Sequence, residues 1–306
     1  MLSRRKLFII PLVILMLMVF SGCSPAVTKP NPSDIQTKQG GLLQVHFLNV
    51  GQADSILVMV PNGQTILIDG GNVEDGPGVI SYLKSQGVKQ LTAIVATHPH
   101  EDHIGGLAAV IRSFPPQQVY LSNGTATTQA FKDFMTSVNN SGAKKIRVKA
   151  NTQLDVSGIT GLFLAPYSEH YEDLNNYSAV LKLTYGKVSF LFTGDAESIS
   201  EAEMLKNGED LRATVLKVGH HGSSSSTSKA FLKAVSPQYA VISVGVNNDY
   251  GHPAQTTLKK LAGAGVQVYR TDQDGTIIAT SNGDTITFTK TGETIPSNTP
   301  PLKAAD

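Results

Sequence analysis

Short apolar runs separated by Gly, Pro and polar stretches alternate along most of this chain with longer amphipathic segments. The short runs predict buried strands, and the longer segments predict helices that pack on them. Strands joined by tight turns come first and strands separated by helices come later, which predicts two sheets packed face to face with helices outside. Predicted strands are 42–49, 54–60, 65–69, 91–96, 118–122, 145–149, 160–165, 178–185, 188–192, 214–218, 240–244, 266–269, 275–280 and 285–289. Predicted helices are 77–86, 104–111, 128–139, 198–206, 228–235 and 255–262.

The N-terminal segment departs from this pattern. Three basic residues at 4–6 precede the apolar run 7–20 and a small-residue stretch that ends at Cys23, the single cysteine of the chain. This order is typical of an export signal, and the run is shorter than the roughly 20 residues of a membrane-spanning helix. We expect residues 1–22 to be a lipoprotein signal peptide and Cys23 to carry the lipid; an uncleaved anchor is the alternative. Both alternatives place the folded part outside the cytoplasm, at the membrane.

Composition marks the borders of the folded part. Residues 23–40 are rich in Pro, Thr, Asn, Gln and Lys, which predicts a flexible tether. Residues 291–306 contain three Pro and predict a loose tail, so 41–290 is the predicted domain. Removal of residues 1–22 would leave 22 basic and 24 acidic residues, a net charge of −2. This balance provides no general attraction to nucleic acid or to an anionic membrane.

Candidate metal ligands concentrate in the segment 97–106, Thr-His-Pro-His-Glu-Asp-His-Ile-Gly-Gly, between a predicted strand and a predicted helix. Residues two apart in an extended chain point the same way, so His98 and His100 can bind one ion. Asp102 and His103, at the turn into the helix, can bind a second ion. Imidazole nitrogens and carboxylate oxygens are ligands of zinc and manganese. The segment therefore predicts a metal site.

This loop, Asp69 in Leu-Ile-Asp-Gly-Gly and Asp195 in Phe-Thr-Gly-Asp-Ala-Glu together resemble the metallo-β-lactamase superfamily. The resemblance implies an α/β fold, the αββα four-layer sandwich, with metal bound at one edge of the sheets. Residues 49–55, Asn-Val-Gly-Gln-Ala-Asp-Ser, resemble the Asp-Val-Gly-Gln-Gly-Asp element of the extracytoplasmic hydrolase domain of the ComEC/Rec2 competence proteins. Asn49 and Ala53 depart from that element. Val-Gly-His-His-Gly-Ser, Tyr-Gly-His-Pro and Tyr-Arg-Thr-Asp-Gln-Asp-Gly follow in the order of that branch.

The resemblance implies two divalent ions, Zn²⁺ or Mn²⁺, held by side chains from three parts of the chain. The candidate metal ligands are His98, His100, Asp102, His103, Asp195, His220 and His221. Asp195 would bridge the two ions. Adjacent residues in extended conformation cannot both face one ion. Either His220 or His221, with His221 favoured, would therefore complete the set of ligands of the second ion.

Other residues receive roles by the same comparison. The superfamily usually supplies a third His to the first ion, and the corresponding window of this chain contains none, so Asn176 or a water would take that place. Asp69 would accept a ring N–H of a ligand His, or else would only occupy a turn. Asp102 and His252 are the candidate catalytic residues, His252 as a donor to the substrate or leaving group. Ser223 would offer its hydroxyl to a phosphate.

The favoured function is an extracytoplasmic metal-dependent hydrolase, a phosphodiesterase or nuclease of the ComEC type that uses a metal-bound hydroxide. The resemblance makes DNA the leading substrate, and the lipid on Cys23 makes the membrane the expected partner. A phosphoesterase acting on wall or choline-bearing polymers is the second hypothesis. A metal-binding lipoprotein without catalysis is the third.

Overall fold

The computed structural model describes residues 41–295, so the predicted signal peptide, the tether and most of the predicted tail lie outside the described residues. Two sheets make up this part of the chain. One has eight strands in the order β15-β14-β1-β2-β3-β4-β5-β6, and the other has seven in the order β13-β12-β11-β10-β9-β8-β7. Within residues 41–295, each helix is too short or too polar to cross a membrane.

The elements are as follows. The first half contains β1 (Leu43–Phe47), β2 (Ile56–Met59), β3 (Thr65–Ile68), η2 (Val73–Asp75), α1 (Gly76–Ser85), β4 (Ala93–Ala96), α2 (Glu101–Ile104), α3 (Leu107–Ser113), β5 (Gln118–Leu121), α4 (Gln129–Asn140) and β6 (Lys144–Arg147). The next part contains β7 (Gln153–Leu154), β8 (Thr160–Phe163), η3 (Leu174–Tyr177), β9 (Leu181–Tyr185), β10 (Val188–Phe192), α5 (Ser198–Lys206), β11 (Val215–Lys217) and η4 (Gly219–Gly222). The last part contains α6 (Lys229–Val235), β12 (Tyr239–Ile242), α7 (Gln255–Gly263), β13 (Gln267–Arg270), α8 (Thr271–Asp274), β14 (Ile277–Ser281) and β15 (Ile286–Lys290).

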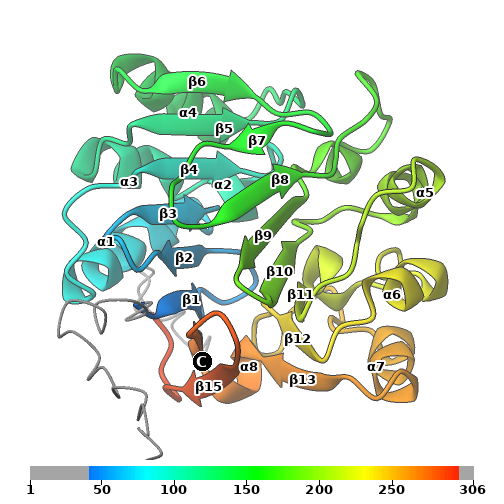
Figure 1. Cartoon of the computed structure of the whole chain (residues 1–306). Helices are drawn as coiled ribbons and strands as arrows, with labels where there is room; N and C mark the ends of the chain where they lie inside the picture. Colours follow the sequence, from blue (N-terminus) through cyan, green and yellow to red (C-terminus); the bar gives the residue numbers. More distant parts are fainter. Residues whose placement is uncertain (1–40, 296–306) are drawn as a thin grey trace, which may run out of the picture. The chain divides into compact units, whose positions relative to one another are not determined.

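The sheets and helices form four layers. Figure 1 shows α1, α3 and α4 outside the eight-stranded sheet and α5, α6 and α7 outside the seven-stranded sheet. Aromatic residues fill the space between the sheets: the rings of Phe47 on β1 and Phe192 on β10 lie 6.2 Å apart, and Tyr120 on β5 stacks on Phe163 of β8 at 5.4 Å. Burial of each such side chain contributes roughly 1.5–3 kcal/mol. The predicted αββα fold is confirmed.

The predicted helix 104–111 is wrong in one respect, because the chain forms two helices there. Gly105 and Gly106 separate α2 from α3, and a Cβ on Gly106 would lie 2.1 Å from the carbonyl oxygen of Gly70. Only glycine allows the metal loop to approach the end of β3 this closely. Asp102 and His103 consequently lie in a helical turn of their own.

The predicted tail also differs from the structure where it is described. The Asn49 side-chain amide donates to the Thr294 hydroxyl at 2.8 Å, and the Ile295 N–H donates to the Asn49 carbonyl at 3.0 Å. Ile295 is buried against the helical side of the first sheet. Residues 293–295 therefore pack on the domain, and Asn49 holds them there.

The parallel strands bring the chemical residues together. β10, β11, β12 and β13 run parallel to one another, as do β3, β4, β5 and β6. The carboxyl ends of parallel strands lie on the same side of a sheet, and ligand sites form there. The predicted metal-binding segment follows β4, and Asp195 follows β10. The pair His220 and His221 follows β11, and His252 follows β12.

Candidate metal centre

Asp195 lies at the middle of a cluster of imidazoles. Its Oδ1 lies 3.3 Å from His103 Nε2, and its Oδ2 lies 4.0 Å from His98 Nε2. The carboxylate is placed by a turn at Gly194 (φ +50°), where a Cβ would collide with Thr97 at 2.9 Å. The Asp195 N–H donates to the Ser178 hydroxyl at 3.0 Å, which fixes the turn from the other side.

The predicted loop ligands lie around this carboxylate. His98 Nε2 is 3.0 Å from Nδ1 of His100, so the two rings face one position, as the spacing of two predicts. Asp102 Oδ2 lies 3.7 Å from His103 Nε2 on the other side. His98 and His103 are fully buried, whereas His100 and Asp102 border the solvent.

The expected extended conformation of His220 and His221 is wrong, whereas the favoured His221 does lie with Asp102, His103 and Asp195 in one potential ligand group. Both residues adopt left-handed backbone conformations, with φ of 48° and 50°, instead of extended ones. Their Nε2 atoms lie 3.8 Å and 3.6 Å from Asp195 Oδ2, so both rings border the same carboxylate. Two successive non-glycine residues with positive φ are rare, and the flanking Gly219 and Gly222 were the only sequence signal of such a turn.

Hydrogen bonds at the outer ring nitrogens orient these two imidazoles. His221 Nδ1 donates to the Ser243 carbonyl at 2.9 Å, which directs Nε2 into the cluster, 3.2 Å from Asp102 Oδ2. His220 Nδ1 lies 3.0 Å from the carboxylate of Glu197. Partners of this kind fix the tautomer and direction of metal-binding histidines.

Asp69 lies behind His103. Its Oδ2 contacts His103 Nδ1 at 2.8 Å, and it accepts hydrogen bonds from the Thr97 N–H at 2.9 Å and the Thr97 hydroxyl at 2.7 Å. His103 thereby points its Nε2 into the cluster. The contact is the one that the proposed orienting role of Asp69 requires.

A buried ion pair, which the sequence reasoning missed, contacts the Nδ1 side of the His221 ring. Lys217 Nζ lies 2.7 Å from Asp54 Oδ2, and both side chains are almost completely buried. Asp54 Oδ1 is 3.6 Å from His221 Nδ1, and the Asp54 N–H donates to the carbonyl of Asp102 at 3.1 Å. A lysine within the apolar strand Val-Leu-Lys-Val was the signal that could have revealed the pair, because buried lysines require a partner.

The charges of the cluster depend on one another. Burial alone would raise the pKa of Asp195, but the facing His103 and His221 hold it well below its usual range. Burial alone would lower the pKa of His103, but Asp195, Asp102 and Asp69 together raise it well above the usual value. Burial and the neighbouring His103 lower the pKa of His98, which keeps this ring neutral and able to bind a cation.

The cluster fits a divalent cation. Ligand atoms of Asp102, His103, Asp195 and His221 all lie within 4.8 Å of one another. His103 Nε2 and Asp195 Oδ1 are buried and have no hydrogen-bond partner within residues 41–295. Buried polar atoms nearly always have a partner, and a cation between them would provide it. Nitrogen and carboxylate ligands suit zinc or manganese.

Two other predicted residues lie differently from the expectation. The Asn176 side-chain oxygen accepts the Ser200 N–H at 3.2 Å, so this amide caps the start of α5. The hydroxyl near His98 is instead that of Ser178, 3.5 Å from His98 Nδ1. The Ser223 hydroxyl lies 2.8 Å from that of Ser225, inside the loop after η4.

An open cleft of about 300 Å³ exposes the cluster to solvent. The cleft is lined by Gln52, His100, Glu101, Asp102, Asp195, His220, His221, Tyr250 and His252. The His252 ring lies 5.4 Å from that of His220, and its Nδ1 has no hydrogen-bond partner within residues 41–295. Burial and then His220 lower the pKa of His252.

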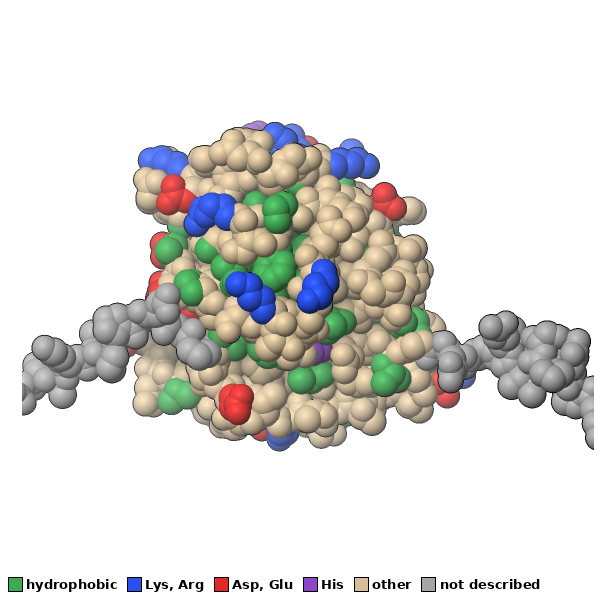
Figure 2. All heavy atoms as spheres, turned by 90° about the vertical axis from the view of Figure 1, so that its left-hand side faces the viewer, with side chains coloured by type: hydrophobic (Ala, Val, Ile, Leu, Met, Phe, Trp, Pro, Cys, Tyr) green, Lys and Arg blue, Asp and Glu red, His purple; other side chains and the backbone are tan. Residues whose placement is uncertain are grey.

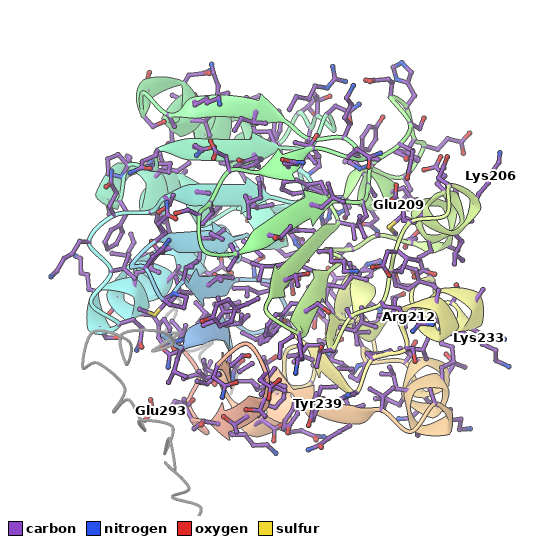
Figure 3. All side chains as sticks on the ribbon, in the orientation of Figure 1. Lys206, Glu209, Arg212, Lys233, Tyr239 and Glu293 are labelled. Carbon is purple, nitrogen blue, oxygen red and sulfur yellow. The ribbon has the colours of Figure 1, made fainter. Side chains whose placement is uncertain are left out.

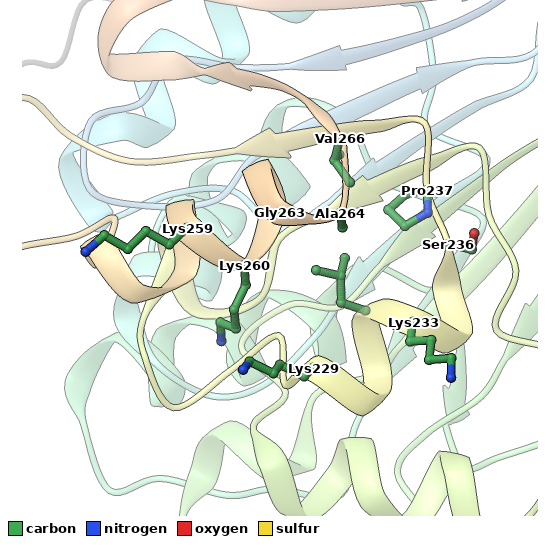
Figure 4. Close-up of a pocket in the computed structure, with 10 residues that line it drawn as sticks. Lys229, Lys233, Ser236, Pro237, Lys259, Lys260, Gly263, Ala264 and Val266 are labelled. Carbon is green, nitrogen blue, oxygen red and sulfur yellow. The ribbon is translucent and has the colours of Figure 1, made fainter.

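A larger groove, of about 530 Å³, lies between α6 and α7 and contains none of the cluster residues. Figure 4 shows the lysines that border it, 229, 233, 259 and 260. Lys260 donates to the Ser226 carbonyl at 2.9 Å, and Lys233 extends from α6 away from the sheets (Figure 3). The lysines at 233 and 260 lie in the last turns of their helices, where positive charge is favoured. Most of the residues predicted to bind metal therefore border the smaller cleft and not this groove.

Two packed sheets with outer helices and a histidine–aspartate cluster at the strand ends define a metal-binding α/β protein. Residues 48–246 match the Metallo-beta-lactamase superfamily, and the chain belongs to this superfamily of metal-dependent hydrolases. The predicted superfamily is confirmed.

The chain is also similar to curated competence proteins, which confirms the predicted branch. It is 31% identical over 251 residues to ComE operon protein 3 of Bacillus subtilis (strain 168), covering 76% of this chain and 32% of that protein. It is 33% identical over 231 residues to Competence protein ComA of Neisseria gonorrhoeae, covering 75% of this chain and 31% of that protein. The chain thus spans about a third of the length of these relatives.

A solved structure shows the same fold. The metallo-beta-lactamase fold protein YhfI from Bacillus subtilis aligns with a TM-score of 0.52 at 12% identity, covering 75% of this chain and 96% of that chain. At this identity the likeness concerns the fold alone.

Proposed function

We propose that this chain is a metal-dependent phosphodiesterase that acts on nucleic acid outside the cytoplasm. The observation that carries the proposal is a pair of buried atoms, His103 Nε2 and Asp195 Oδ1, that have no hydrogen-bond partner within residues 41–295. Asp195 also lines an open polar cleft. The similarity to competence proteins supports nucleic acid as the substrate. The sequence of residues 1–23 supports the location outside the cytoplasm, with a lipid on Cys23 as the membrane anchor.

Two groups of side chains would hold two ions, either zinc or manganese. His98 and His100 face one position, and Asp102, His103 and His221 face the other, with Asp195 between them. Divalent ions in such a site lower the pKa of water and neutralise charge that develops on phosphoryl oxygens.

Residues around the metal ligands orient the histidines and transfer protons. Asp69 and the Ser243 carbonyl keep the Nε2 atoms of His103 and His221 directed at the centre. His252 lines the cleft, where its ring can exchange a proton with the departing oxygen. The outer helical face in Figure 2 carries scattered basic and acidic side chains without a continuous basic surface. We attribute most of the substrate affinity to the metal centre and the cleft, since the net charge of −2 after removal of residues 1–22 provides no general attraction to nucleic acid.

The test is hydrolysis by the purified chain loaded with Mn²⁺ or Zn²⁺. Substrates are bis-p-nitrophenyl phosphate and DNA, and bound metal is measured on the same sample. Asp195→Ala should lower turnover by roughly a thousand-fold or more, since the charge stabilisation by bound metal is worth several kcal/mol. Asp133→Ala, which changes an exposed carboxylate on α4, is the matched control and should keep full activity. Full activity of Asp195→Ala at normal metal content would refute the bridging role.

A further inference from the structure

An exposed aromatic ring lies at the rim of the metal cleft. Tyr250 lines the cleft, and 72% of its surface is exposed, although Tyr is a large apolar residue. Its ring stacks on that of His252, with centroids 5.7 Å apart and an angle of 24° between the planes. His252 covers one face of the tyrosine, and the high exposure leaves the other face available to a ligand.

The loop that carries Tyr250 is held in place by hydrogen bonds. The Asn248 amide donates to the carbonyls of Gly245 at 3.0 Å and His252 at 2.7 Å, and its oxygen accepts the His252 N–H at 3.0 Å. The Gly245 N–H donates to the Gln52 side chain at 3.1 Å, which ties the loop to the other wall of the cleft. These bonds hold the backbone around Tyr250, and the stack on His252 positions the ring before any ligand binds, so little conformational entropy is lost on binding.

We propose that Tyr250 is a stacking platform for an unpaired nucleobase next to the scissile phosphodiester, so that the chain selects single-stranded nucleic acid. This inference rests on the proposed phosphodiesterase function. In nucleic acid each phosphate is flanked by planar bases, and a base whose phosphate lies at the metal centre can reach the rim. In a duplex both faces of an internal base are covered, so only an unpaired or terminal base can stack on a protein ring.

The composition of the cleft favours a base over a quaternary ammonium group such as choline. Quaternary ammonium groups are recognised by cages of several aromatic rings. Among the residues that line this cleft, Tyr250 is the one aromatic residue other than histidine, and His252 already covers its inner face. A single flat platform matches a flat ring.

The test compares two single-stranded oligonucleotides with identical phosphates, one with ordinary bases and one built of abasic residues. KM is measured with hydrolysable linkages, and binding is measured by fluorescence anisotropy with phosphorothioate linkages that resist cleavage. The wild-type chain should bind the base-bearing strand about 5- to 150-fold more tightly, the factor that corresponds to roughly 1–3 kcal/mol per stacked base. Tyr250→Phe should keep this preference, and Tyr250→Ala should lose it.

Val246→Ala is the matched control, because Val246 is a 66% exposed apolar residue of the same loop that does not line the cleft. Equal binding of the two strands by the wild-type chain, or an equal loss for both strands in Tyr250→Ala, would overturn the platform. Stronger competition by phosphocholine than by a nucleoside monophosphate would overturn it in favour of a choline-bearing polymer. Base-dependent binding without any hydrolysis would contradict the proposed function while supporting the platform.

Discussion

The buried pair of Lys217 and Asp54 allows a quantitative prediction about stability. Both side chains are at most 2% exposed, and the Nζ–Oδ2 distance is 2.7 Å. Asp54 Oδ1 has no hydrogen-bond partner within residues 41–295, so Lys217 is the main compensation for this carboxylate. Removal of one partner from a buried ion pair leaves an uncompensated charge and costs roughly 3–5 kcal/mol. Lys217→Met should therefore lower the free energy of unfolding by about that amount.

The assay is thermal or urea-induced unfolding of the metal-free protein. In a domain of this size each kcal/mol shifts the Tm by roughly 2–4 °C, so Lys217→Met should lower the Tm by about 6–20 °C. The double variant Lys217→Met/Asp54→Asn should be more stable than Lys217→Met alone, because it removes the orphaned charge as well.

An exposed pair provides the matched control. Lys187 Nζ lies 2.6 Å from Asp284 Oδ1, but these side chains are 82% and 62% exposed. Exposed pairs contribute about 0–1 kcal/mol, so Lys187→Met should hardly change the Tm. If Lys217→Met is no more destabilising than Lys187→Met, the reasoning about the buried pair is refuted.

Three further predictions concern the metal centre, the pH dependence and the anchor. Asp69→Asn cannot accept a hydrogen bond from His103 with its amide nitrogen, and metal affinity measured by calorimetry should fall roughly 10- to 100-fold; unchanged affinity would exclude the orienting role. Burial lowers the pKa of His46 to about 4 from 6.5, so between these pH values the unfolded chain binds a proton that the folded chain does not. The free energy of unfolding should thus fall by roughly 3 kcal/mol as the pH drops from about 6.5 to about 4, and His46→Gln should flatten this slope in urea titrations at several pH values. Cys23→Ala should release the protein from the membrane fraction or stall its processing; unchanged size and anchoring would rule out lipidation at this residue.

Several features could be read from the sequence because they depend on local pattern. The strands followed from short apolar runs, and the order of hairpins and helices indicated two packed sheets. The metal loop was recognisable because His98, His100, Asp102 and His103 are close in sequence, so local geometry alone brings them together. Asp69 was assigned through resemblance, and its contact with His103 spans 34 residues.

Other features depend on long-range contacts that sequence pattern does not contain. The left-handed backbone at His220 and His221, where both rings lie beside Asp195, differs from the extended conformation expected from the sequence. Asn176 was assigned by its place in the chain, but the fold turns its amide toward α5 and leaves Ser178 beside His98.

The sequence by itself determined most of the strands and helices and the local group of metal ligands, because each depends on residues a few positions apart. The order of these elements and the resemblance to a known superfamily indicated the fold class. Only the tertiary structure decided which residues contact the outer side of these ligands and which residues line the rim of the cleft. The Lys217–Asp54 pair joins residues 163 positions apart, and Tyr250 reaches the cleft through contacts of its loop with Gln52. Both contacts join the eight-stranded sheet to the seven-stranded one, so they arise only when the two sheets pack face to face and the loops at their edges meet.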